Sequence, residues 1–152
     1  MKIKYIKGDA TCPQGSGKKI IAHVCNDRGG WGSGFVVAIS KKWKDPEKNY
    51  REWYRNGTDF ALGNIQISPT KQSDIFVANM IAQKGFGGVA IQYDKLRQCL
   101  SKLRDIAILE KASIHGPKFG SGLAGGDWSI IEKIIEEELC QKNIEVTIYV
   151  LD

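Results

Sequence analysis

A single stretch decides the fold: Ile20-Ile21-Ala22-His23-Val24-Cys25-Asn26-Asp27-Arg28-Gly29-Gly30-Trp31-Gly32-Ser33-Gly34-Phe35. Its first part is an apolar run that is typical of a buried strand. The glycines that follow predict a sharp loop, and the apolar positions of residues 35–43 fit one face of a helix. Such a loop exposes backbone N–H groups, and the next helix points its positive end at them. The stretch therefore predicts an anion-binding site.

A second glycine cluster, Gly120-Ser121-Gly122-Leu123-Ala124-Gly125-Gly126, repeats this arrangement further along the chain. A short apolar run at residues 113–117 precedes it, and an amphipathic segment at residues 130–139 follows it. Two such loops predict a ligand with a diphosphate or with two anionic parts. Glycine spacing alone also fits tight turns between packed elements, and neither a P-loop nor a dinucleotide-binding fingerprint is present.

The rest of the pattern interleaves strands with helices. Strands are expected at residues 2–6, 19–25, 62–67, 74–82, 113–117 and 145–151, helices at 35–43, 45–56, 91–109 and 130–139, and a loop at 85–88. Ser129-x-x-Glu132 matches a capping box and predicts the start of the last helix. This order predicts an α/β fold, a three-layer α/β/α sandwich with a mixed, largely parallel central sheet, as one domain over residues 1–152. Ligands of such sheets bind at the carboxyl ends of strands, where both glycine clusters fall.

Composition narrows the class of protein. The 152 residues are 42% hydrophobic and 26% charged, as in ordinary globular proteins, and no apolar run approaches the ~18 residues of a membrane span. The net charge of +5 is spread along the chain, which favours a mildly basic surface over a nucleic-acid footprint. Residues 1–6 alternate like a strand and not like a signal peptide, so we expect a cytoplasmic protein without membrane contact.

The four cysteines show no paired or zinc-ligand spacing. We expect four reduced thiols, with Cys99 and Cys140 in the core, and nothing in the sequence requires a metal or a cofactor.

Three polar residues at strand ends or within strands are candidates for ligand contacts. Asp9 is either a turn residue or a carboxylate that accepts from an exocyclic amine such as adenine N6. His23 lies within a buried run, where a structural role is commoner than a catalytic one. Asn26 either holds the first glycine loop or binds a ribose hydroxyl.

Three further residues lie within or beside the glycine clusters. Trp31 either covers a ligand or packs against the next helix. Lys118 meets a phosphate or is solvated. Asp127 either caps the last helix or acts as a general base.

Taken in order, five segments resemble the macro domain family over nearly the whole chain. They are Lys7-Gly8-Asp9-Ala10, residues 21–26, residues 29–35, Ala78-Asn79-Met80-Ile81-Ala82-Gln83, and Pro117-Lys118-Phe119 continuing through the second cluster to Trp128. Within the family, the chain is most similar to the branch of the ADP-ribose-1''-phosphate phosphatase and the terminal ADP-ribose glycohydrolase.

The resemblance implies an ADP-ribose site at the carboxyl edge of a mixed sheet. It places Asp9 at adenine N6, Asn26 near the distal ribose, and the two glycine loops at the phosphates. The ligand-binding residues that it implies are Gly8, Asp9, Ala10, Asn26, Gly30, Trp31, Gly32, Ser33, Gly34, Phe35, Gln83, Lys118, Gly120, Ser121, Gly122, Leu123 and Ala124. Catalysis would rest on His23 and Asp127, with no metal.

Two departures bear on the reaction. Gln83 stands where the glycohydrolase has a lysine, with Lys84 one position later, and Ala124 stands where it has an aspartate, with Asp127 three further on. These departures argue against a lysine-dependent covalent mechanism. We therefore expect a phosphoric monoester hydrolase that acts on ADP-ribose-1''-phosphate. The alternatives are a non-catalytic module that binds ADP-ribose, or a hydrolase that removes ADP-ribose from proteins or nucleic acids.

Overall fold

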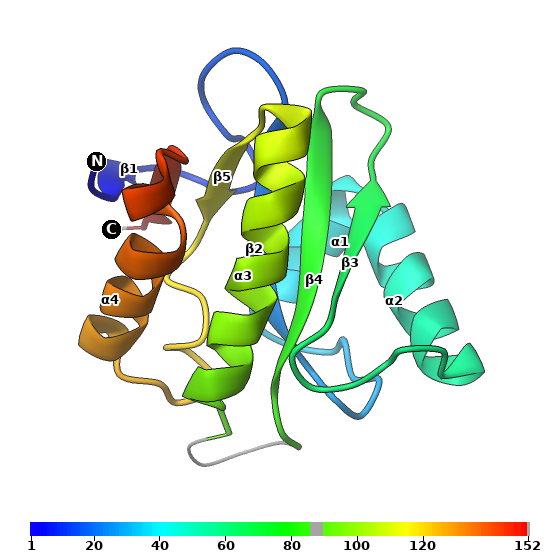
Figure 1. Ribbon diagram of the computed structural model, residues 1–152. Coiled ribbons are helices and arrows are strands. Elements are labelled where there is room, and N and C mark those ends of the chain that lie inside the picture. Colours follow the sequence, from blue (N-terminus) through cyan, green and yellow to red (C-terminus); the bar gives the residue numbers. More distant parts are fainter. Residues whose placement is uncertain (86–89, 152) are drawn as a thin grey trace.

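A six-stranded sheet runs through the centre of the computed structural model, which describes residues 1–85 and 90–151 (Figure 1). Its strand order is β1-β6-β5-β2-β4-β3. The strands are β1 (Lys4–Lys7), β2 (Lys19–Asn26), β3 (Ile65–Pro69), β4 (Ile75–Gln83), β5 (Ser113–Gly116) and β6 (Val146–Val150). Neighbouring strands are parallel except for β3, which is antiparallel to β4. The prediction of a mixed, largely parallel sheet is confirmed.

Helices cover both faces of the sheet. They are α1 (Phe35–Lys42), α2 (Asp45–Asn56), α3 (Tyr93–Glu110) and α4 (Trp128–Glu138), followed by the short 3-10 helix η1 (Cys140–Lys142). Because side chains alternate along a strand, Ile20 and Ile21 of β2 enter different cores. Ile21 packs with α1 and α2, and Ile20 packs with α3 and α4. The three-layer sandwich predicted from the sequence is therefore what the chain forms.

Most element boundaries lie within two residues of the prediction, and two differences have a clear structural reason. β3 begins at Ile65 and not at residue 62, because Gly63 has a left-handed φ of +93° and breaks the alternating pattern. The prediction of a capping box that starts at Ser129 was wrong. The N-cap of α4 is Asp127, whose side chain accepts a hydrogen bond from the Ser129 N–H. Of the predicted loop at 85–88, residues 86–88 lie outside the described residues.

The core contains most of the thiols. All four cysteines are free, and Cys25, Cys99 and Cys140 are buried. Within residues 1–85 and 90–151, we find no helix with the length and hydropathy that crossing a bilayer requires.

The parallel strands bring several loops to one edge. The carboxyl ends of the parallel strands β1, β6, β5, β2 and β4 share one edge of the sheet, and β2 and β4 end toward the bottom of Figure 1. The first glycine loop leaves β2 at this edge, and the second leaves β5 there. Two clusters about 90 positions apart in sequence are thus adjacent in the fold.

Candidate functional site

A cavity of about 680 Å³ lies between the two glycine loops at the carboxyl edge of the sheet. It is lined by His23, Val24, Cys25, Asn26, Gly30, Trp31, Gly32, Ser33, Gly34, Phe35, Val36, Gln83, Pro117, Lys118, Phe119, Gly120, Gly122, Leu123 and Ala124. Most residues named from the sequence therefore meet around one space. Gly8, Asp9, Ala10, Ser121 and Asp127 do not line it.

Asn26 holds the first glycine loop in shape. Its side-chain Oδ1 accepts hydrogen bonds from the backbone N–H groups of Arg28 at 2.9 Å and Gly30 at 3.0 Å, and its Nδ2 donates to the Gly30 carbonyl at 3.0 Å. A bulge between Cys25 and Asn26 shifts the register of β2 against β4 at this point. Such bulges redirect a side chain next to a site. Contact between Asn26 and a ribose stays a prediction.

The two loops leave a series of backbone N–H groups without an acceptor. Within the described part of the chain, the N–H groups of residues 31–34 and 122–124 donate no hydrogen bond. Unpaired backbone donors beside a helix N-terminus form a ready anion site. Because α1 begins directly after residues 31–34, the first loop has this geometry.

The loops approach each other at Gly34 and Leu123. A Cβ on Gly34 would lie 3.0 Å from the Leu123 side chain, and the φ of Gly34 is +86°. Both the conformation and the close approach favour glycine at this position. Leu123 is 62% exposed, so an apolar side chain spans the gap between the loops in contact with solvent.

His23 lies against the cavity as a buried, neutral imidazole. Its Nε2 is 2.6 Å from Asn79 Oδ1, and Asn79 Nδ2 donates to Gln66 Oε1 at 3.0 Å. This orientation of the Asn79 amide assigns the ring proton to Nε2 and leaves Nδ1 as an acceptor. Burial lowers the pKa of His23 to about 4, although the Asn79 bond opposes the shift. At neutral pH the ring therefore carries no charge.

Trp31 packs inward against this histidine. The rings of Trp31 and His23 meet edge to face with centroids 5.3 Å apart, and Trp31 is only 5% exposed. Of the two hypotheses for this residue, packing against the next helix is confirmed, because Trp31 shares a core with Val36 and Ile39 of α1, and it also forms part of the cavity wall.

Cys25 is a cavity residue that sequence reasoning missed. Its Sγ lies 3.7 Å from His23 Nε2, and burial raises its pKa well above the usual range, so it is a thiol and not a thiolate. Small apolar residues of a buried strand have one pattern whether they face a helix or a cavity. The available signal was its position next to Asn26, at the end of the strand. Val24 of the same strand was missed for the same reason, and Val36, Pro117 and Phe119, which lie outside β2, were also missed.

The carboxylate of Asp127 caps α4. It accepts from the Ser129 hydroxyl at 2.7 Å and from the Ser129 N–H at 2.9 Å, and these bonds lower its pKa. Of the two roles that the sequence left open, the capping role is the one that its contacts display. Asp127 does not line the cavity. Its catalytic role stays a prediction.

Lys118 does line the cavity. Its Nζ lies 5.9 Å from the centroid of the Trp128 ring, in a cation–π contact.

Asp9 follows β1 at the same edge of the sheet. One carboxylate oxygen accepts from the Thr11 N–H and hydroxyl, each at 2.8 Å, and these bonds lower the pKa of Asp9. The other oxygen makes no hydrogen bond with the described residues. An ionised oxygen without a partner fits the predicted contact with an exocyclic amine, which stays a prediction.

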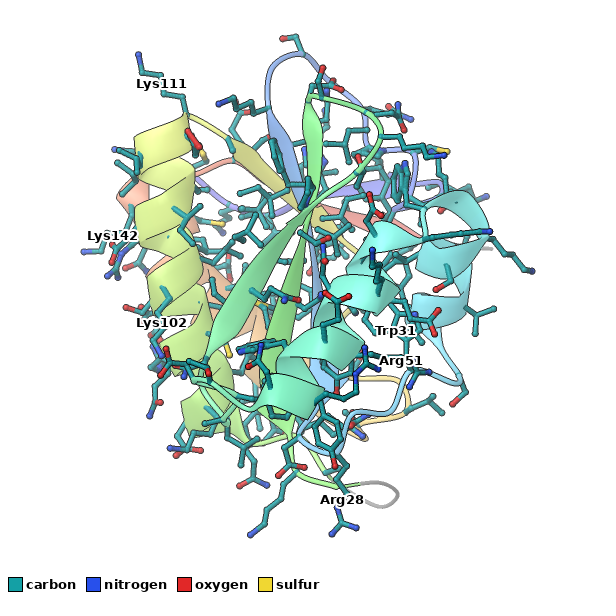
Figure 2. The ribbon with its side chains drawn as sticks, turned by 90° about the vertical axis from the view of Figure 1, so that its right-hand side faces the viewer. Arg28, Trp31, Arg51, Lys102, Lys111 and Lys142 are labelled. Carbon is teal, nitrogen blue, oxygen red and sulfur yellow. The ribbon has the colours of Figure 1, made fainter. Side chains whose placement is uncertain are left out.

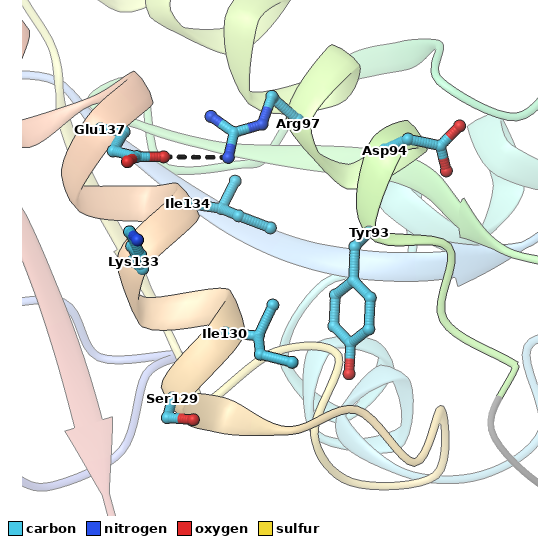
Figure 3. A pocket seen from close by; sticks show the side chains of 8 residues that line it. All are labelled: Tyr93, Asp94, Arg97, Ser129, Ile130, Lys133, Ile134 and Glu137. Atoms are coloured by element: carbon cyan, nitrogen blue, oxygen red, sulfur yellow. Dashed lines mark hydrogen bonds and ion pairs between the residues drawn. The ribbon is translucent and has the colours of Figure 1, made fainter.

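A second groove of about 620 Å³ lies between α3 and α4 (Figure 3). Arg97 on its wall forms an ion pair with Glu137 at 2.9 Å. None of the residues predicted to bind ligand or to react lines this groove, although Ser129, the partner of Asp127, does. We therefore take the cavity between the glycine loops as the candidate site.

Comparison with solved structures identifies the family. A macrodomain protein from Streptomyces coelicolor is 44% identical, with a TM-score of 0.89 and coverage of 98% of this chain and 99% of that one. The chain belongs to the macrodomain family. A protein of unknown function from Bacteroides thetaiotaomicron is 52% identical, with a TM-score of 0.96 and 98% of each chain covered. The macrodomain fold extends to Thermosipho africanus DarTG in complex with ADP-ribose, 15% identical with a TM-score of 0.78, with 99% of this chain and 42% of that one covered.

Curated macrodomain relatives differ in length. The ADP-ribose 1''-phosphate phosphatase of Candida albicans is 28% identical, with 98% of this chain and 99% of that protein covered. The chromodomain-helicase-DNA-binding protein 1-like of Danio rerio is 32% identical over 97% of this chain, which spans only 15% of that protein. No family model matches the chain.

Proposed function

We propose that this macrodomain binds ADP-ribose and hydrolyses ADP-ribose 1''-phosphate. The observation that carries the proposal is the pair of loops around one cavity, each with backbone N–H groups that lack an acceptor in the described chain. Coverage of 97–98% of the chain by its relatives supports one domain over residues 1–152.

The strand order supports an orientation for the ligand. Asp9 follows β1 at one side of the sheet, whereas Asn26 and Gln83 end β2 and β4 toward the other side. In the proposed complex, adenine lies near Asp9, the diphosphate lies between the glycine loops, and the distal ribose lies above β2 and β4. The same orientation would present ADP-ribose that is attached to a macromolecule.

The chemistry of the cavity wall favours a phosphate ester over a glycosidic bond. None of the described lining residues carries a carboxylate. Glycoside hydrolysis generally uses a pair of carboxyl groups. Phosphoryl transfer instead depends mainly on positioning and on stabilising charge. Backbone N–H groups and Lys118 are of the type that supplies such stabilisation.

The proposed reaction is attack of water on phosphorus. The bond from the water oxygen to phosphorus forms, the bond from phosphorus to the ribose oxygen breaks, and a proton reaches that oxygen. His23 lines the cavity as a neutral ring with an acceptor nitrogen, so we propose that it accepts the proton of the attacking water and returns this proton to the ribose oxygen as the ester bond breaks. Asp127 would have to leave its cap to take part.

The test combines calorimetric titration of ADP-ribose with measurement of phosphate release from ADP-ribose 1''-phosphate. We expect saturable binding and turnover, and turnover lost in His23→Ala with ADP-ribose binding retained. Binding without turnover would support a second candidate, a non-catalytic ADP-ribose-binding module. The buried histidine with a pKa of about 4 and the capped Asp127 favour that candidate. Absence of ADP-ribose binding would overturn both.

A further inference from the structure

The indole of Trp31 begins a hydrogen-bond chain that leaves the cavity. Trp31 Nε1 donates to Ser40 Oγ at 2.7 Å, and Ser40 Oγ donates to Glu47 Oε1 at 2.9 Å. Ser40 belongs to α1 and Glu47 to the first turn of α2. The chain thus joins the first glycine loop to two helices.

A second chain returns from Glu47 to the same loop. Arg51 Nε donates to Glu47 Oε2 at 2.9 Å, and Arg51 NH1 donates to the Gly29 carbonyl at 3.1 Å. Gly29 and Trp31 are two positions apart, so the contacts form a closed ring through the loop backbone. Figure 2 shows Trp31 and Arg51 on the side of the molecule that α1 and α2 cover.

Each oxygen of the Glu47 carboxylate has a different partner. The bond from Arg51 and the bond from Ser40 lower the pKa of Glu47 against the opposing effect of partial burial. The side chains of Glu47 and Arg51 are 34% and 42% exposed. An exposed ion pair adds little stability by itself, so stability alone is a weak reason for this arrangement.

We propose that Glu47 is a positioning residue for the first glycine loop, acting through Ser40 and Trp31 on one side and through Arg51 and Gly29 on the other. Glu47, Ser40 and Arg51 lie outside the cavity wall. A loop rich in glycine has many conformations, and unpaired N–H groups bind an anion well only when they are already oriented. Glu47 supplies this orientation for the N–H groups of residues 31–34. The inference rests on the proposed function, because it assigns the distal part of ADP-ribose to this loop.

The first test is Glu47→Gln, because Ser40 and Arg51 donate to different oxygens of Glu47, and the amide replaces one of these two acceptors with a donor NH2 group. Glu52→Gln is the matched control, on an exposed position of the same helix with the same change in charge. Calorimetry would compare ADP-ribose with AMP, which lacks the second phosphate and the distal ribose. Glu47→Gln should weaken ADP-ribose about tenfold and AMP less than about twofold, and Glu52→Gln should weaken neither. Equal loss for both ligands, or no loss, would overturn the inference.

A readout that needs no ligand separates the inference from the proposed function. Hydrogen exchange of the Trp31 indole N–H, assigned by comparison with Trp31→Phe, should accelerate in Glu47→Gln and in Ser40→Ala but not in Glu52→Gln. Accelerated exchange in a protein that does not bind ADP-ribose overturns the proposed function alone. Unchanged exchange overturns the positioning role of Glu47.

Discussion

The two glycine loops are anchored by the same kind of contact. In each case a tryptophan indole N–H donates to a hydroxyl, and that hydroxyl donates to a glutamate carboxylate. The two chains are Trp31–Ser40–Glu47 for the first loop and Trp128–Tyr5–Glu132 for the second. They differ in what lies beyond the glutamate and in how far solvent reaches them.

The hydrogen-bond chain of the second loop, Trp128–Tyr5–Glu132, is exposed to solvent and, among the residues that the structure describes, does not return to its loop. Trp128 Nε1 donates to the Tyr5 hydroxyl at 2.9 Å, and Tyr5 is 41% exposed. Partial burial and the bond to Glu132 raise the pKa of Tyr5 to about 12, so the hydroxyl stays protonated. We find no bond from Glu132 back to residues 120–126 within the described chain.

The second loop is instead held by its own backbone. The Gly126 N–H donates to the Gly120 carbonyl at 2.8 Å, and the Gly125 N–H donates to the Gly122 carbonyl at 3.0 Å. The first loop takes its shape from side chains of β2 and α2, above all Asn26. The unpaired N–H groups are therefore held in place by side chains in the first loop and by backbone hydrogen bonds in the second.

The largest effect is expected when the backbone packing of the second loop is broken. A Cβ at Gly126 would lie 2.5 Å from the Gly120 carbonyl oxygen and 2.9 Å from Ile131 Cδ1. Gly126→Ala should therefore destabilise the protein by about 2–4 kcal/mol, measured by urea unfolding. Gly122→Ala is the control, because no atom lies within 4 Å of its added Cβ. Similar losses in both variants would contradict the assignment of loop shape to backbone packing.

Removing the Asn26 side chain should be the strongest way to break the first loop. Asn26→Ala leaves the N–H groups of Arg28 and Gly30 without their acceptor, and we expect ADP-ribose affinity to fall about thirtyfold. Asn26→Asp keeps the acceptor for the two N–H groups, but it turns a second oxygen toward the Gly30 carbonyl and adds a negative charge beside the proposed phosphate site, so it should also bind more weakly than the parent protein. Calorimetry measures both variants, and unchanged affinity in Asn26→Ala would show that these bonds do not set the loop.

Loss of the second glutamate should matter less than loss of the first. Glu132→Gln breaks an exposed chain that does not return to its loop, and we expect ADP-ribose affinity to change by less than about threefold. Glu47→Gln, with its closed ring, should lose more under the same conditions. A larger loss of ADP-ribose affinity in Glu132→Gln than in Glu47→Gln would contradict the stronger role assigned to the chain through Glu47.

Asp127 offers a test of capping against catalysis next to the second loop. Asp127→Ala removes an N-cap and should lower the free energy of unfolding by about 1 kcal/mol, with ADP-ribose affinity unchanged. Thermal unfolding and phosphate release would be measured on the same preparation. Turnover abolished at unchanged stability would instead assign Asp127 to the reaction.

The smallest change is expected in the titration of His23 beneath the first loop. Its pKa in the folded protein is about 4, below the 6.5 that is usual for histidine, so the folded state takes up this proton at a lower pH than the unfolded state does. The contribution to stability is complete above pH 6.5 and is lost as the pH falls toward 4. NMR of the ring should show no protonation between pH 8 and 6, whereas a midpoint near 6.5 would contradict the buried, neutral assignment.

Much of the fold was predictable because its elements have strong periodic patterns. The buried β2 and β4 and the amphipathic α3 and α4 follow from their apolar spacing. The start of β3 could not be found in this way, since the left-handed φ of Gly63 breaks the alternation without any change in residue class. Asp127 and Ser129 both fit an N-cap pattern, and only the backbone geometry decides between them.

The placement of the two glycine loops around one cavity was predictable from the sequence, whereas the distant side chains that hold the first loop were not. The glycine loops were recognisable because their local sequence specifies their shape. Cys25 was missed because a cavity-facing residue and a core residue look alike in a buried strand. The connection from Glu47 to the first loop runs through Ser40 and Arg51 and depends on how α2 packs, which no local pattern encodes.

We propose that both loops bind one ligand through backbone N–H groups. An amide-resolved NMR titration with ADP-ribose tests this proposal most directly. We expect the amide resonances of residues 31–34 and 122–124 to shift together and to saturate with a single dissociation constant. Shifts confined to the groove between α3 and α4, or to one glycine loop, would contradict the claim.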